Sequence, residues 1–276
     1  MTIYDMNRAK TAFKQGGEFL GKAIAIFNQK GGVGKTTTNI NLAACLALKG
    51  KHILVLDIDP QGNTTSGIGI AKRGLTKTMY EVLVDDQLNP EDAILETIVP
   101  GLDIIPASVE LAGAEIELVH LGGREKRLRK ALDKIRDRYD YIFIDCPPSL
   151  GLLTINSLTA VDSVLIPIQC EFYALEGVSQ LISTIELVKK SLNPKLKIEG
   201  VILSMFDGRT NLSIQVVEEV KKYFREKVYT TVIPRNVRLA EAPSFGMPIT
   251  EYDPRSKGAI AYRNFAEEFL ELEEGR

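Results

Sequence analysis

The segment from Ala23 to Gly50 constrains the fold more than any other part of the sequence. It begins with the short apolar run AIAIFN (Ala23–Asn28), passes through the glycine-rich stretch QKGGVGKTT (Gln29–Thr37) and continues with helical periodicity. The apolar run predicts a buried strand, and Gly50 is the expected stop of a helix over Thr36–Lys49. A strand that leads through a glycine loop directly into a helix is typical of a parallel α/β sheet, and we predict that class.

Short β-rich runs alternate with longer helix-period segments in the rest of the chain, as crossover connections require. Runs such as ILVL and YIFI are apolar throughout, which predicts a strand buried on both faces. We therefore expect a mostly parallel, twisted sheet of about 7–8 strands with helices on both faces. The predicted strands are Ala23–Asn28, Ile53–Asp59, Leu102–Ala107, Tyr141–Asp145, Ser163–Ile168, Ile198–Phe206 and Tyr229–Pro234; the further predicted helices are Arg124–Arg138, Leu175–Ser191, Ser213–Arg225 and Gly258–Glu273.

Length and composition favour one domain. The chain has 276 residues, 45% of them hydrophobic, and contains no internal repeat or Pro/Gly/Ser-rich linker. We predict a single domain over residues 22–276, preceded by a loose arm over residues 1–21, for which an upstream start codon is an alternative explanation. No run approaches the roughly 18 apolar residues of a membrane span, and the N-terminus lacks the apolar block of a signal peptide, so a cytoplasmic location is expected.

The cysteines are Cys45, Cys146 and Cys170, which are far apart and form no C-x-x-C pair. We expect buried free thiols rather than a disulfide framework or a zinc knuckle. With only two histidines in the chain, a histidine-rich metal site is not expected.

Charge is distributed unevenly along the chain. The formal net charge is −2, but residues 186–238 hold 11 Lys and Arg against 6 Asp and Glu, a balance of +5. Residues 239–276 hold 4 against 8, a balance of −4. A local basic excess matters more to an anionic partner than the total charge does.

The glycine-rich stretch has the features of a phosphate-binding loop. Glycines allow successive backbone N–H groups to point inward at phosphate oxygens, and the following helix N-terminus favours negative charge. Lys35 is expected to reach the β- and γ-phosphates, and the Thr36 hydroxyl to ligate Mg²⁺. The strict G-x-x-x-x-G-K-[ST] pattern requires glycine where this chain has Gln29, and Lys30 adds a second charge beside it.

Three aspartates lie at or near the ends of predicted strands. Asp57 and Asp59 in LDIDPQGN are two residues apart, so on a strand they share a face. Asp59 is the first candidate for the residue that orients the hydrolytic water and supports magnesium, and Asp57 is more typical of a structural group. A simple turn through Pro60 and Gly62 is the alternative. Asp145 ends YIFID and fits the second magnesium-supporting carboxylate of phosphate-loop enzymes.

Four motifs occur in order: KGGVGKTT, LDIDPQGN, IDCPPSLGLLTINSL and IPRNVRLAEAPS. With this order and spacing the chain closely resembles the ParA/Soj chromosome- and plasmid-partition ATPases, in the deviant Walker A group of P-loop NTPases that also holds MinD. The resemblance covers the chain from about Lys22 to the C-terminus.

This resemblance implies a Mg²⁺-dependent ATPase that encloses two ATP molecules between two copies of the chain. In the family the extra lysine, here Lys30, contacts the nucleotide of the other subunit. Asp59 matches the hydrolytic aspartate, Asp145 the Walker B aspartate, and Pro234 and Asn236 the segment around adenine. The residues that match the phosphate cradle are Gly31, Gly32, Val33, Gly34, Lys35, Thr36 and Thr37.

The resemblance also implies partners. The ATP dimer of this family binds double-stranded DNA without sequence preference, and a ParB-like protein on a centromere-like site stimulates hydrolysis, so a nucleoid-associated location is expected. Arg209 and Arg238 match positions implicated in DNA contact. Lys221, Lys222 and Arg225 extend the patch or form an ordinary solvated helix face.

Three alternatives remain open from the sequence. A MinD-like membrane protein is disfavoured because the chain ends in the acidic NFAEEFLELEEGR, although an arm with Arg8, Lys10 and Lys14 leaves room for a weak membrane contact. A nitrogenase-iron-protein-like reductase needs exposed thiolates in an arrangement that the cysteines do not match. A nucleotide-switched regulator of replication or sporulation initiation uses the same ATP dimer, and the sequence does not separate it from cargo partition.

Overall fold

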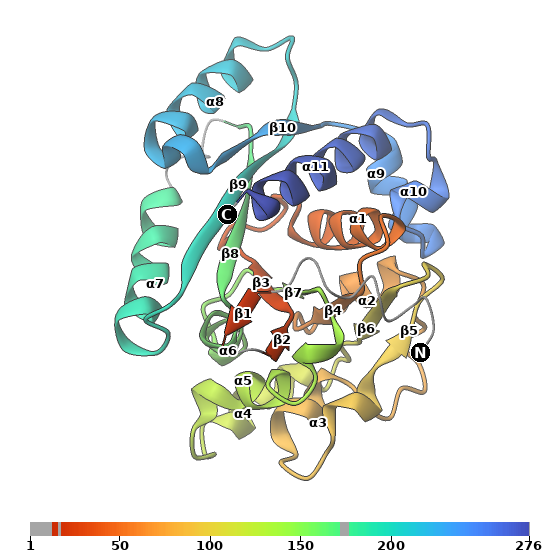
Figure 1. Cartoon of the computed structure of the whole chain (residues 1–276), viewed down its shortest axis with the longest axis vertical. Coiled ribbons are helices and arrows are strands. Elements are labelled where there is room, and N and C mark those ends of the chain that lie inside the picture. Colours follow the sequence, from red (N-terminus) through yellow and green to blue (C-terminus); the bar gives the residue numbers. More distant parts are fainter. Residues whose placement is uncertain (1–12, 16–17, 172–176, 276) are drawn as a thin grey trace.

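The computed structural model describes residues 13–15, 18–171 and 177–275 and is built on one eight-stranded sheet (Figure 1). The strand order is β10-β9-β8-β3-β7-β4-β6-β5. Adjacent strands run parallel except for the antiparallel pair β5–β6 at one edge. The strands are β3 Lys22–Ile26, β4 Ile53–Asp57, β5 Leu95–Glu96, β6 Leu102–Ile105, β7 Tyr141–Asp145, β8 Ser163–Gln169, β9 Lys197–Phe206 and β10 Val228–Pro234. The α/β class and all seven predicted strands are confirmed, and β5 is added at the edge.

Helices cover both faces of this sheet, as the apolar strands require. One face packs mainly against α1 and α11, with Phe143 of the sheet beside Phe269 of α11. The other face packs against α3 to α8, which surround a second apolar cluster (Figure 1). The helices are α1 Lys35–Leu48, α2 Asn63–Gly67, α3 Met79–Val84, α4 Leu111–Leu118, α5 Arg127–Leu132, α6 Leu152–Ala160, α7 Val178–Ser191, α8 Asn211–Phe224, α9 Val237–Glu241, α10 Ile249–Tyr252 and α11 Lys257–Glu274.

The register of the central strands brings the motifs together. β7 lies between β3 and β4, and Asp145 at its end is paired in register with Ile26 on one side and Asp57 on the other. The glycine loop leaves β3 at this edge, and the Asp59 turn leaves β4 beside it. The carboxyl ends of parallel strands are the usual ligand side of an open α/β sheet.

Two predictions about element bounds are wrong. β4 ends at Asp57, so Asp59 lies in a turn beyond the strand and does not share a strand face with Asp57. The predicted helix Arg124–Arg138 is broken into a 3₁₀ turn over Arg124–Lys126, α5, and a 3₁₀ turn over Arg136–Arg138. The break follows from tertiary bonds: Arg127 is buried and donates to the Leu83 and Val84 carbonyls that end α3.

Part of the predicted arm has regular structure. β1 (Phe13–Gln15) pairs antiparallel with β2 (Glu18–Leu20), and the following Gly21 N–H donates to the Arg136 carbonyl at 2.9 Å. Arg8 and Lys10 lie outside the described residues, as do the first two residues of the predicted helix Leu175–Ser191. The division into an arm over residues 1–21 and one domain over 22–276 stays a prediction.

The three thiols are buried, as predicted, and free. Burial raises the pKa of Cys45 and of Cys146 to about 12 and that of Cys170 to about 11. A thiol with such a pKa is protonated near neutral pH and is a poor metal ligand. Within the described ranges, no group of three or more His, Cys, Asp or Glu side chains is arranged to hold a metal ion.

Candidate nucleotide-binding site

The glycine loop adopts the conformation that its composition predicts. Gly32 has φ +75° and Gly34 has φ +90°, values that residues with a Cβ rarely adopt. Gly34 is the N-cap of α1, so the helix begins with its free N–H groups at the loop. A Cβ built on Gly31 or Gly32 meets no described atom within 4 Å, so the space above the loop is open. This open cradle of N–H groups is suited to phosphate oxygens.

Side chains beneath the loop hold its shape. The Asn28 Oδ1 accepts from the Lys30 N–H at 3.0 Å, while Asn28 Nδ2 donates to the Pro167 carbonyl at 2.8 Å. The Ser204 hydroxyl donates to the Val33 carbonyl at 2.8 Å. Sequence reasoning missed both supports. Asn28 had a local signal, because an asparagine that accepts from the N–H two residues on forms an Asx turn, whereas Ser204 comes from distant β9 and had none.

Gln29 also has a structural partner. Its Nε2 donates to the Thr184 hydroxyl of α7 at 2.8 Å. The residue that replaces the glycine of the strict motif therefore ties the loop to α7.

Lys35 is buried at the start of α1, and its Nζ donates to the Lys30 carbonyl at 3.1 Å. Burial lowers the pKa of Lys35, and the nearby carboxylates of Asp145 and Asp59 oppose that effect. A buried ammonium loses hydration, so it gains when anionic oxygens come within reach.

Asp145 connects the loop to the sheet. Its Oδ2 accepts from the Thr36 hydroxyl and from the Thr64 hydroxyl, each at 2.7 Å. Its Oδ1 is buried and has no hydrogen-bond partner among the described residues. Burial raises the pKa of the Asp145 carboxyl. A buried, unpartnered carboxylate oxygen beside a threonine hydroxyl fits Mg²⁺ and its bound waters, since both groups are hard oxygen donors.

Asp57 has a structural environment, in line with the prediction. It is fully buried, and its Oδ2 accepts from the Thr65 N–H and the Thr65 hydroxyl, each at 2.7 Å. Burial, and next the neighbouring Asp145, raise the pKa of this carboxyl. The Asp57 side chain thus fixes the start of α2 rather than facing the loop opening.

Asp59 lies in the turn between β4 and α2 and is half-buried. Its Oδ1 accepts from the Gln61 N–H at 2.9 Å, and its own N–H donates to Asp57 Oδ1 at 3.3 Å. The charge of Asp59 acts on both Lys35 and Asp145 and shifts their pKa values, which places Asp59 in the same electrostatic site.

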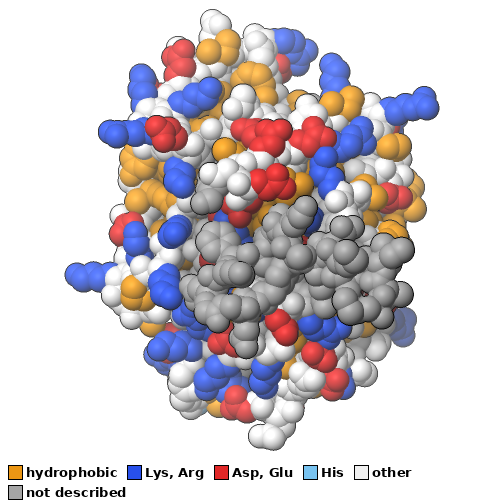
Figure 2. All heavy atoms as spheres, in the orientation of Figure 1, with side chains coloured by type: hydrophobic (Ala, Val, Ile, Leu, Met, Phe, Trp, Pro, Cys, Tyr) orange, Lys and Arg blue, Asp and Glu red, His pale blue; other side chains and the backbone are white. Residues whose placement is uncertain are grey.

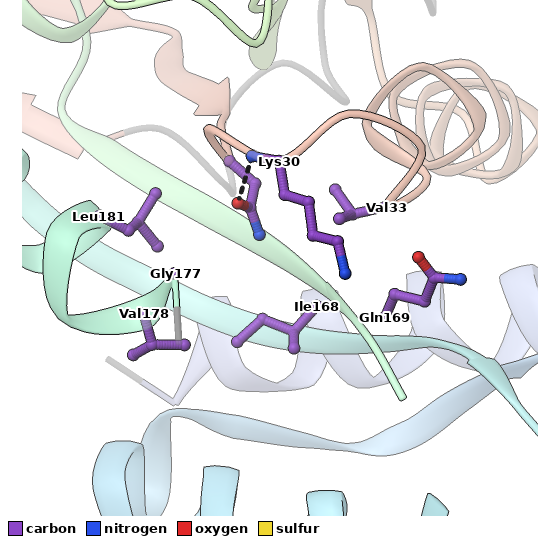
Figure 3. Close-up of a pocket in the computed structure, with 8 residues that line it drawn as sticks. Lys30, Val33, Ile168, Gln169, Gly177, Val178 and Leu181 are labelled. Carbon is purple, nitrogen blue, oxygen red and sulfur yellow. Dashed lines mark hydrogen bonds between the residues drawn. The ribbon is translucent and has the colours of Figure 1, made fainter. Parts of the chain in front are cut away.

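Lys30 lies in a small pocket between the glycine loop, β8 and the start of α7. Its side chain extends toward Val33, Ile168 and Gln169 of its own chain (Figure 3). The structure therefore places the Lys30 side chain against its own chain, and its contact with a second subunit stays a prediction.

Pro234 and Asn236 lie where β10 leads into α9. Pro234 ends β10, and the Asn236 Oδ1 caps α9 by accepting from the Leu239 N–H at 3.3 Å. The cap gives Asn236 a structural role and fixes the direction of this segment. Its predicted contact with adenine is not tested by these bonds.

The predicted DNA-contact residues are all exposed and come from separate segments near α8 and α9. Figure 2 shows Lys and Arg side chains along the edge that carries α7 and α8, and acidic side chains over α11. Arg209 binds Asp207 through two hydrogen bonds of 2.9 and 2.7 Å, which hold the pKa of Asp207 at about 2. Further exposed ion pairs join Arg238 to Glu241 at 2.8 Å and Lys222 to Glu219 at 2.5 Å; the other two predicted cations are Lys221 and Arg225.

Comparison with known proteins identifies the family. Residues 21–198 match a family model described as an AAA domain. Over 249 residues, 65% are identical to the sporulation initiation inhibitor protein Soj of Bacillus subtilis, which covers 90% of this chain and 98% of that protein. The chain belongs to the ParA/Soj family of chromosome partitioning ATPases. This ParA/Soj chain is also 55% identical to the chromosome partitioning protein ParA of Myxococcus xanthus, over 93% of this chain and 90% of that protein.

A solved structure with the same fold contains a nucleotide. The cobyrinic acid a,c-diamide synthase from Mycobacterium smegmatis with bound ADP and magnesium is 39% identical and superposes with a TM-score of 0.81, covering 93% of this chain and 97% of that one. This match confirms the P-loop fold class and shows that a protein of this architecture holds ADP and magnesium. The described part of this ParA/Soj chain has no helix both long and apolar enough to cross a membrane.

Proposed function

We propose that this ParA/Soj-family protein is an ATP-driven DNA-partitioning switch. With ATP and Mg²⁺ it closes into a dimer that holds two nucleotides between its subunits and binds double-stranded DNA without sequence preference. A ParB-like, centromere-binding protein stimulates hydrolysis and resets the cycle, which takes place in the cytoplasm at the nucleoid. The observation that carries the proposal is the bond between Thr36 of the loop and Asp145 of the sheet, formed beside buried Lys35.

The proposed roles follow from the positions of the side chains. The N–H groups of the loop, together with Lys35, bind the phosphates, while Thr36 and Asp145 are placed to hold Mg²⁺ and its waters. When bound, Mg²⁺ neutralises phosphate charge and aligns the terminal phosphate for attack by water. Asp59, half-buried at the same edge, orients that water. Lys30 serves the nucleotide of the second subunit, and Pro234 and Asn236 lie along the base.

Replacing Asp59 with asparagine or alanine tests the hydrolytic role. Both variants are expected to bind ATP, hydrolyse it roughly 100-fold more slowly and accumulate as an ATP-bound dimer, because a water-orienting carboxylate has been removed. Asparagine retains an oxygen for the Gln61 N–H, so it separates loss of charge from loss of the turn. The measurements are single-turnover hydrolysis and size-exclusion chromatography with light scattering, with and without duplex DNA.

Asp85→Asn is the matched control for the Asp59 variants. Asp85 forms the same kind of turn, in which its Oδ1 accepts from the Gln87 N–H at 2.8 Å, and it is exposed at the end of α3. This variant is expected to hydrolyse ATP at the wild-type rate. An Asp59→Ala protein that stays monomeric with ATP, where the wild type dimerises, contradicts the proposed role of Asp59.

The DNA surface is tested by replacing Arg209 and Arg238 with alanine together. The double variant is expected to dimerise normally but to lose at least roughly tenfold in DNA affinity, with a salt slope shallower by about 2 for each subunit that contacts DNA, because two phosphate contacts per subunit are lost. Fluorescence anisotropy of a labelled random-sequence duplex at several salt concentrations measures both quantities. Unchanged affinity and slope contradict the assignment.

Two further variants make this test specific. Replacing Lys77 and Arg138 with alanine together is the control, because it removes two exposed, ion-paired cations outside the proposed patch. This variant is expected to leave the salt slope of DNA binding unchanged. Asp207→Asn removes the carboxylate that competes for Arg209 and is expected to raise DNA affinity. A fall in affinity for Arg209→Ala and a rise for Asp207→Asn are both expected, and an unchanged salt slope in the Lys77 and Arg138 control distinguishes a local phosphate contact from a general loss of charge.

Regulation of sporulation or replication initiation is a second candidate function. It is favoured by the 65% identical relative, which is named as an inhibitor of sporulation initiation. Both candidates use the same nucleotide-dependent dimer. Replacing the chromosomal gene with the Arg209→Ala, Arg238→Ala allele separates them: loss of segregation with normal initiation timing favours partition, and the reverse result favours the regulator.

A further inference from the structure

Thr64 makes a contact that the sequence motifs do not assign. It is the second residue of α2, is fully buried, and donates its hydroxyl proton to Asp145 Oδ2 at 2.7 Å. The same hydroxyl oxygen accepts from Asn39 Nδ2 of α1 at 3.4 Å. Because a hydroxyl has one proton, this amide contact leaves that proton for the Asp145 carboxylate.

The adjacent Thr65 makes the corresponding contact with the neighbouring strand. Its N–H and its hydroxyl both donate to Asp57, and its hydroxyl oxygen accepts from the Ala107 N–H at 2.9 Å. Two consecutive threonines therefore fasten the start of α2 to the carboxylates that end β7 and β4. The turn that carries Asp59 lies between β4 and α2, so its two ends are fixed by this pair of anchors.

The Asp145 anchor differs from the Asp57 anchor in its surroundings. In α2, Asp57 accepts hydrogen bonds from one residue, Thr65, through its N–H and its hydroxyl. Asp145 Oδ2 accepts from two residues, Thr64 of α2 and Thr36 of the glycine loop. One carboxylate oxygen thus joins the loop that is proposed to bind phosphate to the element that follows Asp59. Geometry at the proposed magnesium site and the position of Asp59 are linked through this oxygen.

We propose that Thr64 is a positioning residue for hydrolysis: its hydroxyl, held by Asn39 and bound to Asp145, sets the place of the Asp59 turn relative to the glycine loop. The inference rests on the proposed function of Asp59 and adds a residue that acts through it. We expect phosphate affinity to change little when this bond is lost, because Ser204 and Asn28 support the glycine loop from beneath.

Thr64→Val keeps the shape of the side chain and removes the hydroxyl. We expect kcat for ATP hydrolysis to fall roughly tenfold, with KM and ADP affinity within about twofold of wild type, because misplacement of a catalytic group lowers turnover rather than binding. Thr64→Ser restores the hydroxyl and is expected to recover most of the lost kcat. Hydrogen exchange of the nucleotide-free protein supplies a readout without catalysis: residues 57–67 are expected to exchange faster in Thr64→Val.

Thr159→Val is the matched control. Thr159 of α6 is also fully buried, but its hydroxyl has no hydrogen-bond partner among the described residues, so the same substitution removes no bond. It is expected to have wild-type kcat and wild-type exchange over residues 57–67. Equal kcat in Thr64→Val and Thr159→Val overturns the proposal, as does a failure of Thr64→Ser to recover activity.

Asp59→Asn, measured in parallel, distinguishes a failure of the proposed role of Asp59 from a failure of the proposed role of Thr64. If Asp59→Asn hydrolyses ATP at the wild-type rate, the proposed function of Asp59 fails, and with it the reason for the Thr64 effect. If Asp59→Asn is slow and Thr64→Val is as fast as Thr159→Val, only the role of Thr64 is wrong. A fall in ADP affinity equal to the fall in kcat for Thr64→Val also overturns the proposal, since it indicates general damage to the loop.

Discussion

Lys35→Ala is expected to abolish nucleotide binding. The Lys35 ammonium is buried at the first turn of α1, where the open cradle of the glycine loop meets the Asp145 carboxylate. Its removal takes away a buried cation at the loop and leaves phosphate charge facing Asp59 and Asp145. Loss of a buried, charge-assisted contact of this kind corresponds to at least about 100-fold in affinity. Titration with a fluorescent ADP analogue in the presence of magnesium measures it.

Thermal unfolding distinguishes this effect from a folding defect. Burial lowers the pKa of Lys35, which means that the charged ammonium destabilises the folded chain when no nucleotide is bound. Lys35→Ala is therefore expected to keep or raise the Tm of the nucleotide-free protein and to lose the increase in Tm that nucleotide gives the wild type. Lys49→Ala, at the other end of α1 in an exposed pair with Glu267, is the control and should keep that increase. A nucleotide-dependent rise in Tm for Lys35→Ala contradicts the assignment.

The sequence predicted the sheet well because its signals are local. The runs ILVL and YIFI, over residues 53–56 and 141–144, are apolar throughout, and both strands are fully buried. The helix over Arg124–Arg138 failed for a non-local reason. Arg127 turns inward to the end of α3, and Arg136 bonds the Gly21 carbonyl and Asp162, so tertiary hydrogen bonds override a periodic pattern.

In the candidate site, too, residues in a local motif could be predicted from the sequence, whereas residues that depend on tertiary contacts could not. The glycine loop, Lys35 and Thr36 form a continuous motif whose spacing fixes their geometry, so the sequence identifies them directly. Ser204 of β9 bonds the Val33 carbonyl of that motif, and Thr64 of α2 bonds the Asp145 carboxylate, which in turn bonds Thr36. A threonine beside a turn gives no sign of which strand end its hydroxyl will reach. Such supporting residues emerge only once the register of β3, β7 and β4 is known.

Several carboxylates lie beside Lys35 at the carboxyl ends of β4 and β7. Asp59 and Asp145 act on Lys35, and burial together with repulsion between neighbouring carboxylates raises the pKa of the Asp57 and Asp145 carboxyls. A triphosphate adds further negative charge to this region. Mg²⁺ is one source of compensation, and a cation from a second subunit is another. We propose Lys30 for the second role, because its side chain lines the pockets beside the glycine loop.

Lys30→Ala is expected to leave a monomer that binds nucleotide but does not dimerise with ATP. The Lys30 carbonyl, which accepts from Lys35, belongs to the backbone and is kept in the variant, as is the bond from the Lys30 N–H to Asn28. Phosphate binding in the same subunit is therefore preserved, with an affinity for ADP within about threefold of wild type. The side chain, which rests against Val33 and Gln169 in the single chain, has to swing outward to reach a second nucleotide (Figure 3).

Three measurements decide whether Lys30 acts between subunits. Light scattering of Lys30→Ala with ATP should give a monomer, while Lys189→Ala, which removes an exposed cation paired with Glu186 on α7, should dimerise as the wild type does. Lys30→Met keeps the apolar stem in its pocket and removes only the charge, so it should behave as the alanine variant does. Mixing Lys30→Ala with Asp59→Ala tests the direction of the contact: each mixed dimer has one Lys30 ammonium, so one of its two nucleotides is served. If the contact is made in trans, the Lys30 ammonium of the Asp59→Ala subunit serves the nucleotide of the Lys30→Ala subunit, which keeps Asp59, so the mixture is expected to hydrolyse ATP. If the contact is made within one subunit, the served nucleotide lies in the subunit that lacks Asp59, and the mixture hydrolyses ATP no faster than the pure variants. A Lys30→Ala protein that dimerises with ATP as wild type does shows that the charge acts within its own subunit.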